Sequence, residues 1–386
     1  MQSVIFGADL PDLQFQPMDP DLFEFYSFQT DIAHNPEIIE TIMADFPRLV
    51  KGTEHNEENV QRQNLLDKLQ PLLDENDRVA TSTHEKKVFI KHPAVPPVIL
   101  EHDPELMTKN KFIRQMSMPK YLEDAITAEV KKMWDNGRID LASTNIPVND
   151  RWNSQIFAVT TYDLDGNVKK LRVVPNMINV NKGLLSPPTA LPLIKSILQR
   201  CAAGALYSEI DLQTSFLLLE LAAESRHKTA FTWPPNSSVR YEFYGAPWGL
   251  TFLSGTMQRA LEAILEGMSF VIIFVDNILI ISPNDWNVHY IHLAEVIMKL
   301  NEHFVKMNSK KLQFGYRSMH TLGFKFSQYG VSIAEEKLEA VSKWSVPSNC
   351  IDLTTKMGFL GYLRDQIPAF ADVAKPLHTL CNMAYL

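Results

Sequence analysis

The feature that most constrains the fold is the stretch from Ser269 to Ser282, which reads SFVIIFVDNILIIS. Two apolar runs, each about as long as a buried β-strand, flank the polar pair Asp276-Asn277. Because Asp-Asn favours a tight turn, the pattern predicts a hairpin with a carboxylate at its tip. The stretch is too short for a membrane span and carries a charge at its centre. Taken alone, such a hairpin is more often ordinary core than an active site.

A second segment, from Leu206 to Leu221, also places a lone acid at the end of an apolar strand. It reads LYSEIDLQTSFLLLEL, and Asp211 is predicted to end a short strand and to open an apolar helix. One carboxylate at a hairpin tip and one at a strand end suit a site that holds two divalent cations for nucleotidyl transfer. The sequence therefore predicts that Asp211 and Asp276 meet at the floor of one groove.

Composition limits the class of protein. The chain has 386 residues, of which 45% are hydrophobic and 21% charged. This length and composition predict a globular protein of two or three lobes. It shows no signal peptide and no run of membrane-spanning length, so no membrane partner is expected. Cys201, Cys350 and Cys381 are odd in number and widely spaced. This argues against a disulfide framework or a zinc site and for an intracellular setting, in cytoplasm or nucleus.

Charge is distributed unevenly along the chain. The net charge of −8 does not favour a nucleic-acid binder, but the acidic excess lies in the first 100 residues. The remainder is close to neutral, which leaves room for a local basic groove. Residues 1–100 are rich in Asp, Glu and Pro, with helical patterns at 36–43 and 58–73. They predict an acidic N-terminal extension or linker that ends near Pro96-Pro97.

The rest of the chain carries short motifs in a definite order. A helix is predicted from Pro119 to Gly137, then a hairpin with Asp165-Gly166 as its turn, and three helices after residue 334. The motifs between them are NGRI at 136–139, WNS at 152–154, YSEIDLQTSF at 207–216, KTAF at 228–231, PWGL at 247–250, FVDN at 274–277, LGF at 322–324 and FLGY at 359–362. In order and spacing, over about residues 110–380, they closely resemble the reverse transcriptase of gypsy-class LTR retrotransposons.

The resemblance implies an architecture and an activity. The fold would be α+β, a right-hand polymerase with fingers and palm over residues 101–330 and thumb-like helices over 331–386, preceded by the extension of residues 1–100. The activity would be that of an RNA-directed DNA polymerase, which extends a primer on an RNA or DNA template with deoxynucleoside triphosphates. The chain would be a fragment of a Pol polyprotein, or a free-standing gene derived from one, with RNase H and integrase absent. Its oligomeric state is left open.

The resemblance also assigns roles to single residues. Asp211 and Asp276 would be catalytic and would bind Mg²⁺, for which Mn²⁺ could substitute. Phe216 would crowd the sugar 2′ position, so that the substrate is a deoxynucleotide. The other implied contacts are Lys170 with substrate, Arg172 with the triphosphate, Trp248 and Gly249 with the template base and nascent pair, and Leu322, Gly323 and Phe324 with the primer end.

Several positions depart from the family pattern. Asn277 stands where the family has a third catalytic carboxylate; its amide keeps an acceptor oxygen but lacks the charge, so Asn277→Asp is expected to raise the rate. Ile178 replaces an arginine, Thr161 and Tyr162 replace fingers cations, and 252–254 reads FLS in place of Asn-Ala-Pro. These changes leave two alternatives open: a decayed or domesticated retroelement protein that binds nucleic acid or a protein partner without catalysis, and a purely structural remnant.

Overall fold

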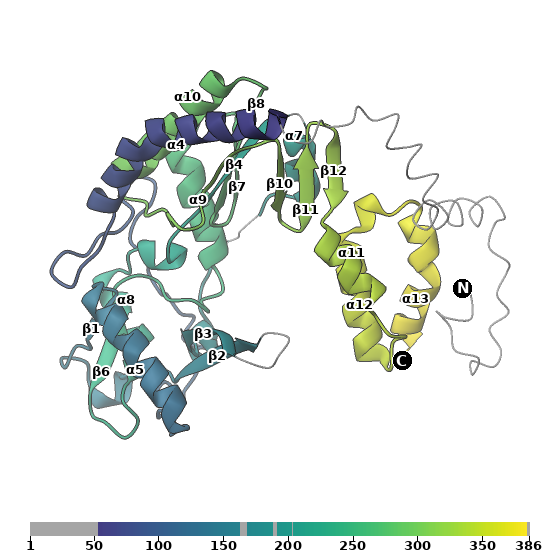
Figure 1. Ribbon diagram of the computed structural model, residues 1–386. Helices are drawn as coiled ribbons and strands as arrows, with labels where there is room; N and C mark the ends of the chain where they lie inside the picture. The colour runs from purple at the N-terminus through teal and green to yellow at the C-terminus, as the bar shows by residue number, and fades with distance from the viewer. Residues whose placement is uncertain (1–52, 163–167, 188–190, 203, 384–386) are drawn as a thin grey trace. The chain divides into compact units, whose positions relative to one another are not determined.

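The structure is a computed structural model of the 386-residue chain, and it describes residues 53–162, 168–187, 191–202 and 204–383 (Figure 1). The chain divides into two compact units. The larger unit comprises Leu65–Met319 and Phe326–Gly330, and the smaller one includes His320–Lys325 and Val331–Leu386. The larger unit begins at Leu65, whereas the sequence predicted a boundary near residue 100.

A four-stranded antiparallel sheet forms the centre of the larger unit. The predicted hairpin is confirmed, because Phe274 pairs with Asn277 and only Val275 and Asp276 lie between the two strands. The segment that ends at Asp211 forms the next strand, which pairs with the hairpin along its whole length. The strand order is β7 (Val271–Phe274), β8 (Asn277–Ser282), β4 (Leu206–Asp211) and β9 (Gln313–Tyr316).

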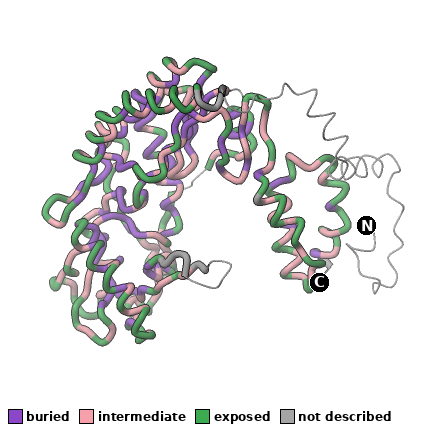
Figure 2. Tube along the Cα trace, viewed as in Figure 1, coloured by how far each residue is buried: buried purple, intermediate pink, exposed green. Residues whose placement is uncertain are grey.

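Helices pack against the back of this sheet because its strands present branched apolar side chains there. Ile210, Ile278 and Ile280 are fully buried in the same cluster as Leu293 and Ile297. Figure 2 shows this buried region in purple. The helices in this part of the chain are α7 (Ile194–Cys201), α9 (Leu253–Ile264) and α10 (Trp286–Glu302), with the short elements η2 (Ser215–Leu218), α8 (Ala223–Arg226) and η3 (His227–Thr229). The sequence predicted an apolar helix after Asp211, whereas the structure has the single 3₁₀ turn η2 there.

Helix α4 (Thr53–Val79) runs along α10, as Figure 1 shows. Leu65 and Leu69 of α4 are buried in the main core. Asn76 is also buried, and its Nδ2 donates to Asn301 Oδ1 of α10 over 2.7 Å. The sequence predicted a helix at 58–73, and the helix extends beyond both of those ends. The helix predicted at 36–43 lies outside the described residues.

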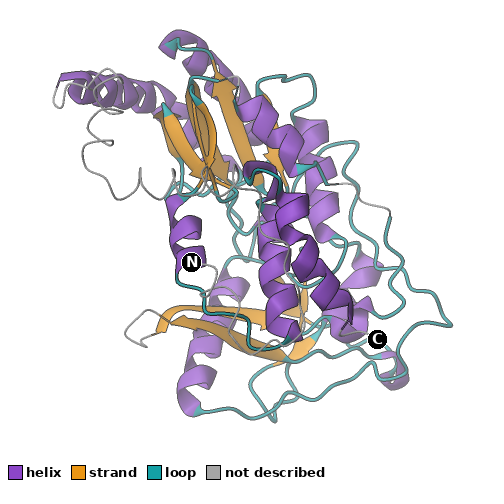
Figure 3. Ribbon diagram, turned by 90° about the vertical axis from the view of Figure 1, so that its right-hand side faces the viewer, coloured by secondary structure: helices purple, strands orange, loops and turns teal. Residues whose placement is uncertain are grey.

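The predicted fingers region contains two smaller β structures. One is a three-stranded sheet, and the other is the predicted long hairpin, whose strands are drawn orange in Figure 3. The Asp165-Gly166 turn of that hairpin lies outside the described residues. The elements are α5 (Lys120–Asp135), β1 (Ile139–Leu141), η1 (Val148–Asp150), β2 (Ile156–Tyr162), β3 (Val168–Pro175), α6 (Ile178–Asn181), β5 (Phe231–Thr232) and β6 (Arg240–Phe243).

The smaller unit contains the three helices predicted near the end of the chain. Met357, Ala374 and Cys381 form a small buried cluster between the second and the third of these helices. A three-stranded sheet of order β10-β11-β12 precedes them in the chain. From residue 318 onward the elements of the chain are β10 (Ser318–Thr321), β11 (Phe324–Ser327), β12 (Gly330–Ile333), α11 (Glu335–Ser342), α12 (Cys350–Tyr362), η4 (Arg364–Gln366) and α13 (Phe370–Met383).

Candidate active site

The two predicted acids come to the same edge of the four-stranded sheet β7-β8-β4-β9, which lies in the predicted palm (the palm sheet). Asp211, the last residue of β4, is the direct ladder partner of Asn277, the first residue of β8. Asp276 immediately precedes Asn277 in the turn. Directly paired residues of an antiparallel ladder point to the same face, so Asp211 and Asn277 share one face of the sheet. The register alone therefore brings two segments that are distant in sequence to one site.

The turn that carries Asp276 is held by a buried glutamine. Val275 has a φ of +59°, which is strained for a β-branched residue and needs support from its surroundings. Its backbone N–H donates to Gln258 Oε1 over 2.7 Å, and Gln258 Nε2 donates to the carbonyl of Ile273 over 3.1 Å. Gln258 lies on α9 and is 1% exposed. Gln258 lies in the block after PWGL that resembles the family, but its contact with this turn was not predicted.

Asp211 is held from the segment that follows α10. Its Oδ1 accepts from Asn308 Nδ2 and its Oδ2 from Lys311 Nζ, each over 3.0 Å. The backbone N–H of Asn308 also donates to the Asp211 carbonyl over 2.9 Å. The Asp211 side chain remains 35% exposed, so water and ions can reach it. Sequence reasoning missed both partners, although the pair Lys310-Lys311 was a visible cationic signal.

Asp276 has a hydroxyl partner from the 3₁₀ turn after β4. The hydroxyl of Ser215 donates to Asp276 Oδ2 over 3.0 Å, and Ser215 is itself buried. Thr214, just before it, has a φ of +50°, so the chain turns sharply after Asp211 and returns to the hairpin tip. Phe216 follows directly and packs, half-buried, against the main core. The site thus links Phe216 to Asp276 through one neighbouring residue.

Asn277 contacts a further acid that the sequence did not single out. Its Nδ2 donates to Oε1 of Glu209, which lies two residues before Asp211 on β4. Both Glu209 and Asn277 are half-buried. The amide of Asn277 is therefore engaged with a carboxylate at the position where the family resemblance implies a third acid.

The donor atoms fit a hard divalent cation in kind. Asp211 and Asp276 supply carboxylate oxygens, the ligands that Mg²⁺ and Mn²⁺ prefer. Lys311 already places an ammonium 3.0 Å from Asp211, so this carboxylate pairs with a cation in the structure. Within the described parts of the chain, no group of three or more Asp, Glu, His or Cys side chains is arranged to hold a metal. The candidate ligands are thus the two aspartates, with the amide of Asn277 beside them.

The residues expected to contact the nucleotide have separate supports. Gly249 has a φ of +96°, which favours glycine, and Asn181 holds its turn by donating to the Gly249 carbonyl over 2.7 Å. Trp248 is half-buried against the main core. Arg172 is exposed on β3, opposite Val159. Lys170 lies on the same strand, but its side chain is outside the described residues.

The residues expected to hold the primer form a tight turn in the smaller unit. Leu322 and Gly323 have φ values of +50° and +73°, and Phe324 is buried. The hydroxyl of Tyr362, at the end of α12, donates to the Leu322 carbonyl. Lys337 Nζ lies 4.2 Å from the centre of the Tyr362 ring. Two helices of the same unit thus fix this turn.

A chain of buried hydrogen bonds lies on the other face of the palm sheet. His289 of α10 is 0% exposed and lies 2.7 Å from Ser208 Oγ through Nε2 and 2.7 Å from Ser282 Oγ through Nδ1. Ser282 Oγ lies 2.8 Å from His292 Nδ1. Burial lowers the pKa of His289 to about 4, so the ring is neutral at pH 7. The network ties α10 to β4 and β8, and its burial excludes a role as an exposed nucleophile.

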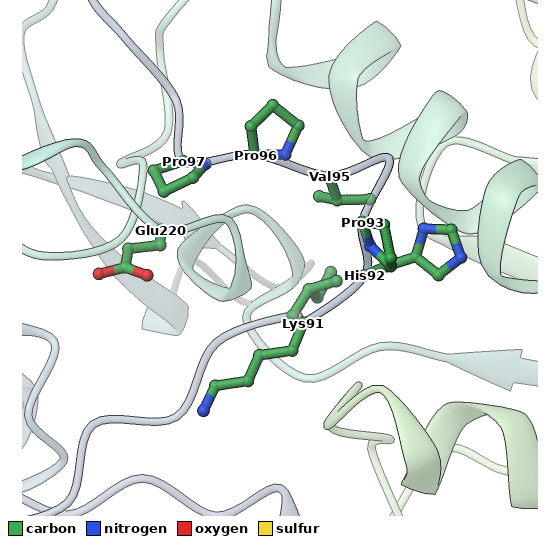
Figure 4. A pocket seen from close by; sticks show the side chains of 8 residues that line it. Lys91, His92, Pro93, Val95, Pro96, Pro97 and Glu220 are labelled. Atoms are coloured by element: carbon green, nitrogen blue, oxygen red, sulfur yellow. The ribbon is translucent and has the colours of Figure 1, made fainter.

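A surface hollow of about 400 Å³ lies elsewhere in the larger unit (Figure 4). Its lining shares no residue with the candidate site and consists of Ile90, Lys91, His92, Pro93, Val95, Pro96, Pro97 and Glu220. Among the helices that the structure describes, none is both long and apolar enough to cross a membrane.

Known proteins resemble the chain in sequence and in fold. The Transposon Tf2-7 polyprotein of Schizosaccharomyces pombe is 25% identical over 334 residues, covering 80% of this chain and 24% of the relative. The Retrovirus-related Pol polyprotein from transposon gypsy of Drosophila melanogaster is 27% identical over 260 residues, covering 66% and 24%. The chain thus spans about a quarter of the length of these curated relatives.

Solved structures share the fold. The foamy viral protease-reverse transcriptase dRH in complex with double-stranded DNA has a TM-score of 0.69 at 20% identity, covering 96% of this chain and 58% of that one. The foamy viral protease-reverse transcriptase in complex with an RNA/DNA hybrid has a TM-score of 0.63 at 18% identity, covering 88% and 44%. The predicted α+β polymerase fold is confirmed by this likeness.

A family model described as reverse transcriptase (RNA-dependent DNA polymerase) matches residues 167–363, just over half of the chain. The match includes both strands that meet at Asp211 and Asn277. The resemblance to gypsy-class retrotransposons predicted from the motifs is confirmed by the transposon relatives. The chain therefore belongs to the reverse transcriptase (RNA-dependent DNA polymerase) family.

Proposed function

We propose that this chain is an RNA-directed DNA polymerase with Asp211 and Asp276 as its catalytic carboxylates. The observation that carries the proposal is the ladder pairing of Asp211 with Asn277, which brings Asp276 to the same edge of the palm sheet. Membership of the reverse transcriptase family supports the type of reaction. The strained turn at Val275 supports it as well, because strain held by a dedicated partner such as Gln258 is typical of functional sites.

In this proposal the carboxylates act by holding charge at fixed positions. Asp211 and Asp276 would hold Mg²⁺, or Mn²⁺ in its place, and the bound metal would lower the pKa of the primer 3′ hydroxyl and neutralise the transferred phosphoryl group. Ser215 orients Asp276, while Asn308 and Lys311 orient Asp211. Because the contacts with Ser215 and Asn308 exist before substrate binds, the carboxylates need little reorientation, whereas Lys311 would have to release Asp211 Oδ2 to a bound metal.

The same proposal assigns the substrates. Phe216, next to Ser215, would exclude a 2′ hydroxyl, and the exposed guanidinium of Arg172 would pair with triphosphate oxygens. The template would be RNA or DNA with an annealed primer. Solved structures of similar fold contain double-stranded DNA or an RNA/DNA hybrid, which supports this class of partner. The three free cysteines support an intracellular setting.

Primer extension on an RNA template, first with Mg²⁺ and then with Mn²⁺, tests the proposal. Asp211→Asn keeps the shape of the side chain and should lower the extension rate at least about 100-fold. Phe216→Ala should admit ribonucleotides if the ring faces the sugar. The proposal fails if the unchanged protein, at high concentration, makes no more product than Asp211→Asn.

A second function is favoured by the neutral amide of Asn277. With one carboxylate fewer than the family pattern, the chain could bind primer–template duplex without extending it. This alternative predicts a binding constant that falls steeply with salt, together with no extension in either metal. Fluorescence anisotropy of a labelled primer–template, measured over a salt series, distinguishes this alternative from a structural remnant, which would not bind.

A further inference from the structure

We infer that Glu209 is a positioning residue for Asn277 and that these two side chains act as one matched pair at the active-site edge of the palm sheet. The inference starts from a contact that no sequence motif indicated, the donation from Asn277 Nδ2 to Glu209 Oε1. It deepens the proposed function and rests on it for the kinetic part of its test.

The strand register explains why Glu209 can reach Asn277. Asp211 pairs with Asn277, and Glu209 pairs with Leu279 two residues further along β8. Residues i and i+2 of a strand point to the same face, so Glu209, Asp211 and Asn277 share the active-site face. Glu209 and Asn277 are thus diagonal neighbours across the ladder, within reach of each other's long side chains.

The chemistry of the contact fixes the orientation of the amide. An ionised carboxylate only accepts hydrogen bonds, so the Asn277 amide can hydrogen-bond to Glu209 only through its NH₂ end. The carbonyl oxygen of that planar amide must then point away from Glu209. An amide that pointed its NH₂ group at a bound cation would repel it, whereas the carbonyl oxygen is a ligand of the kind that Mg²⁺ and Mn²⁺ accept. Glu209 therefore selects the orientation in which Asn277 Oδ1, a buried atom in this structure, is the end of the amide that could act as a ligand.

The same contact explains why Asn suits position 277 in this chain. An aspartate there would put a second carboxylate against Glu209 on a half-buried surface. Like charges at this range repel each other, and partial burial weakens the screening by water. Contrary to the expectation from the family pattern, Asn277→Asp alone should not raise the rate. The gain requires Glu209→Gln as well, because the NH₂ group of a glutamine at position 209 can donate a hydrogen bond to the new aspartate.

The first test uses the full-length protein without metal. Thermal unfolding is measured for the unchanged protein, Asn277→Asp, Glu209→Gln and the double variant. Asn277→Asp should lower Tm by about 2–4 °C, and adding Glu209→Gln should restore most of that loss. Glu266→Gln, at an exposed acid in the loop after α9, is the matched charge control and should not restore it. Additive changes in Tm would overturn the inference.

The second test measures orientation of the amide through metal affinity. Free Mn²⁺ is titrated by electron paramagnetic resonance, which needs no catalysis. Glu209→Gln should weaken Mn²⁺ binding about tenfold, because a neutral glutamine lets the Asn277 amide take either orientation. The double variant should bind more tightly than either single variant. Unchanged Mn²⁺ affinity in Glu209→Gln would contradict a positioning role.

Primer extension then separates this inference from the proposed function. The double variant should extend faster than Asn277→Asp, while Glu209→Gln should lower kcat and leave the affinity for primer–template unchanged. If no protein extends a primer but Tm and Mn²⁺ affinity show coupling between positions 209 and 277, the proposed function fails and the pairing stands. If extension occurs and the two positions behave independently, the polymerase stands and the pairing fails.

Discussion

At the scale of the residue, the candidate site combines short-range charge pairing with contacts from distant segments. Asp211 accepts hydrogen bonds from Asn308 and Lys311, which lie about 100 residues further along the chain. The Lys311 ammonium lies 3.0 Å from Asp211 Oδ2, where it offsets the negative charge of the proposed catalytic carboxylate. It also competes with any divalent cation for the same oxygen. Lys311 is therefore expected to lower the affinity of Asp211 for a metal ion.

His289 provides a residue-scale prediction about pH. Burial lowers the pKa of His289 to about 4, against 6.5 as its ordinary value. Between those values the unfolded chain binds a proton that the folded protein does not, so stability is full above about pH 6.5 and falls as the pH drops towards 4. By pH 5 the loss from this residue should reach about 2 kcal/mol.

Denaturant unfolding at pH 7.5 and pH 5.0 measures this effect. His289→Gln, which cannot be protonated but can still hydrogen-bond to Ser208 and Ser282, should lose less stability between the two pH values than the unchanged protein. His378→Gln, at an exposed position of α13, should lose as much as the unchanged protein. Equal losses in all three proteins would show that His289 does not control the acid sensitivity.

At the scale of the element, helix α4 fixes the segment that carries the partners of Asp211. Asn76 donates to the Val305 carbonyl over 2.9 Å and accepts from the Met307 N–H over 3.0 Å. Lys306, between them, is bound by Asp77 and Thr81. Asn308 follows directly and contacts Asp211. The last turn of α4 is thus connected to Asp211, the proposed catalytic carboxylate, through one short piece of backbone.

Replacing Asn76 by leucine should therefore reduce both stability and rate. The change keeps the size of the side chain but leaves Val305 and Met307 with buried backbone groups that have lost their partner, at a cost of about 2–4 kcal/mol. Denaturant unfolding measures the stability, and primer extension should show a lower kcat with unchanged affinity for primer–template. Asn64→Leu, at an exposed position of the same helix, is the control. If Asn76→Leu is as unstable as expected but keeps its full kcat, α4 does not influence the proposed active site.

A second element-scale prediction concerns the turn expected to hold the primer. A methyl group on Gly323 would meet Lys337 Cε and Nζ at 2.2 Å, and the φ of +73° disfavours any residue with a Cβ. Gly323→Ala should thus lower the free energy of unfolding of its unit by about 1–2 kcal/mol. Gly358→Ala, in α12 with open space around it, should raise it by about 0.5–1 kcal/mol. If Tm shifts in the same direction for Gly323→Ala and Gly358→Ala, this interpretation of the turn is wrong.

At the scale of the whole molecule, the sequence predicted what depends on local pattern. The hairpin at Asp276, the strand that ends at Asp211 and the three closing helices all come from periodicity and turn residues. Asp211 and Asp276 come to the same edge of the sheet because β4 pairs with β8. The polar partners Gln258, Asn308 and Glu209 could not be predicted, because side-chain contacts depend on register and on segments far apart in the sequence.

The same limit applies to the first part of the chain. Its acidic composition and prolines indicated a linker as far as residue 100, and composition carries no information about which helix packs on which. Leu65 and Leu69 are buried in the main core all the same, and Asn76 is buried against α10. The leucine spacing at 65–73 predicted the helix, but it did not predict what the helix packs against.

The packing of α4 against the core determines where a recombinant fragment of this chain can begin. The Pro96-Pro97 dipeptide would be the natural start for a recombinant polymerase fragment, yet such a fragment would lack Leu65, Leu69 and Asn76 and would expose the surface of α10 that they cover. A fragment intended for biochemistry should begin no later than Thr53. If a fragment that begins at Pro96-Pro97 is inactive, that result would therefore not show that Asn277 abolishes catalysis.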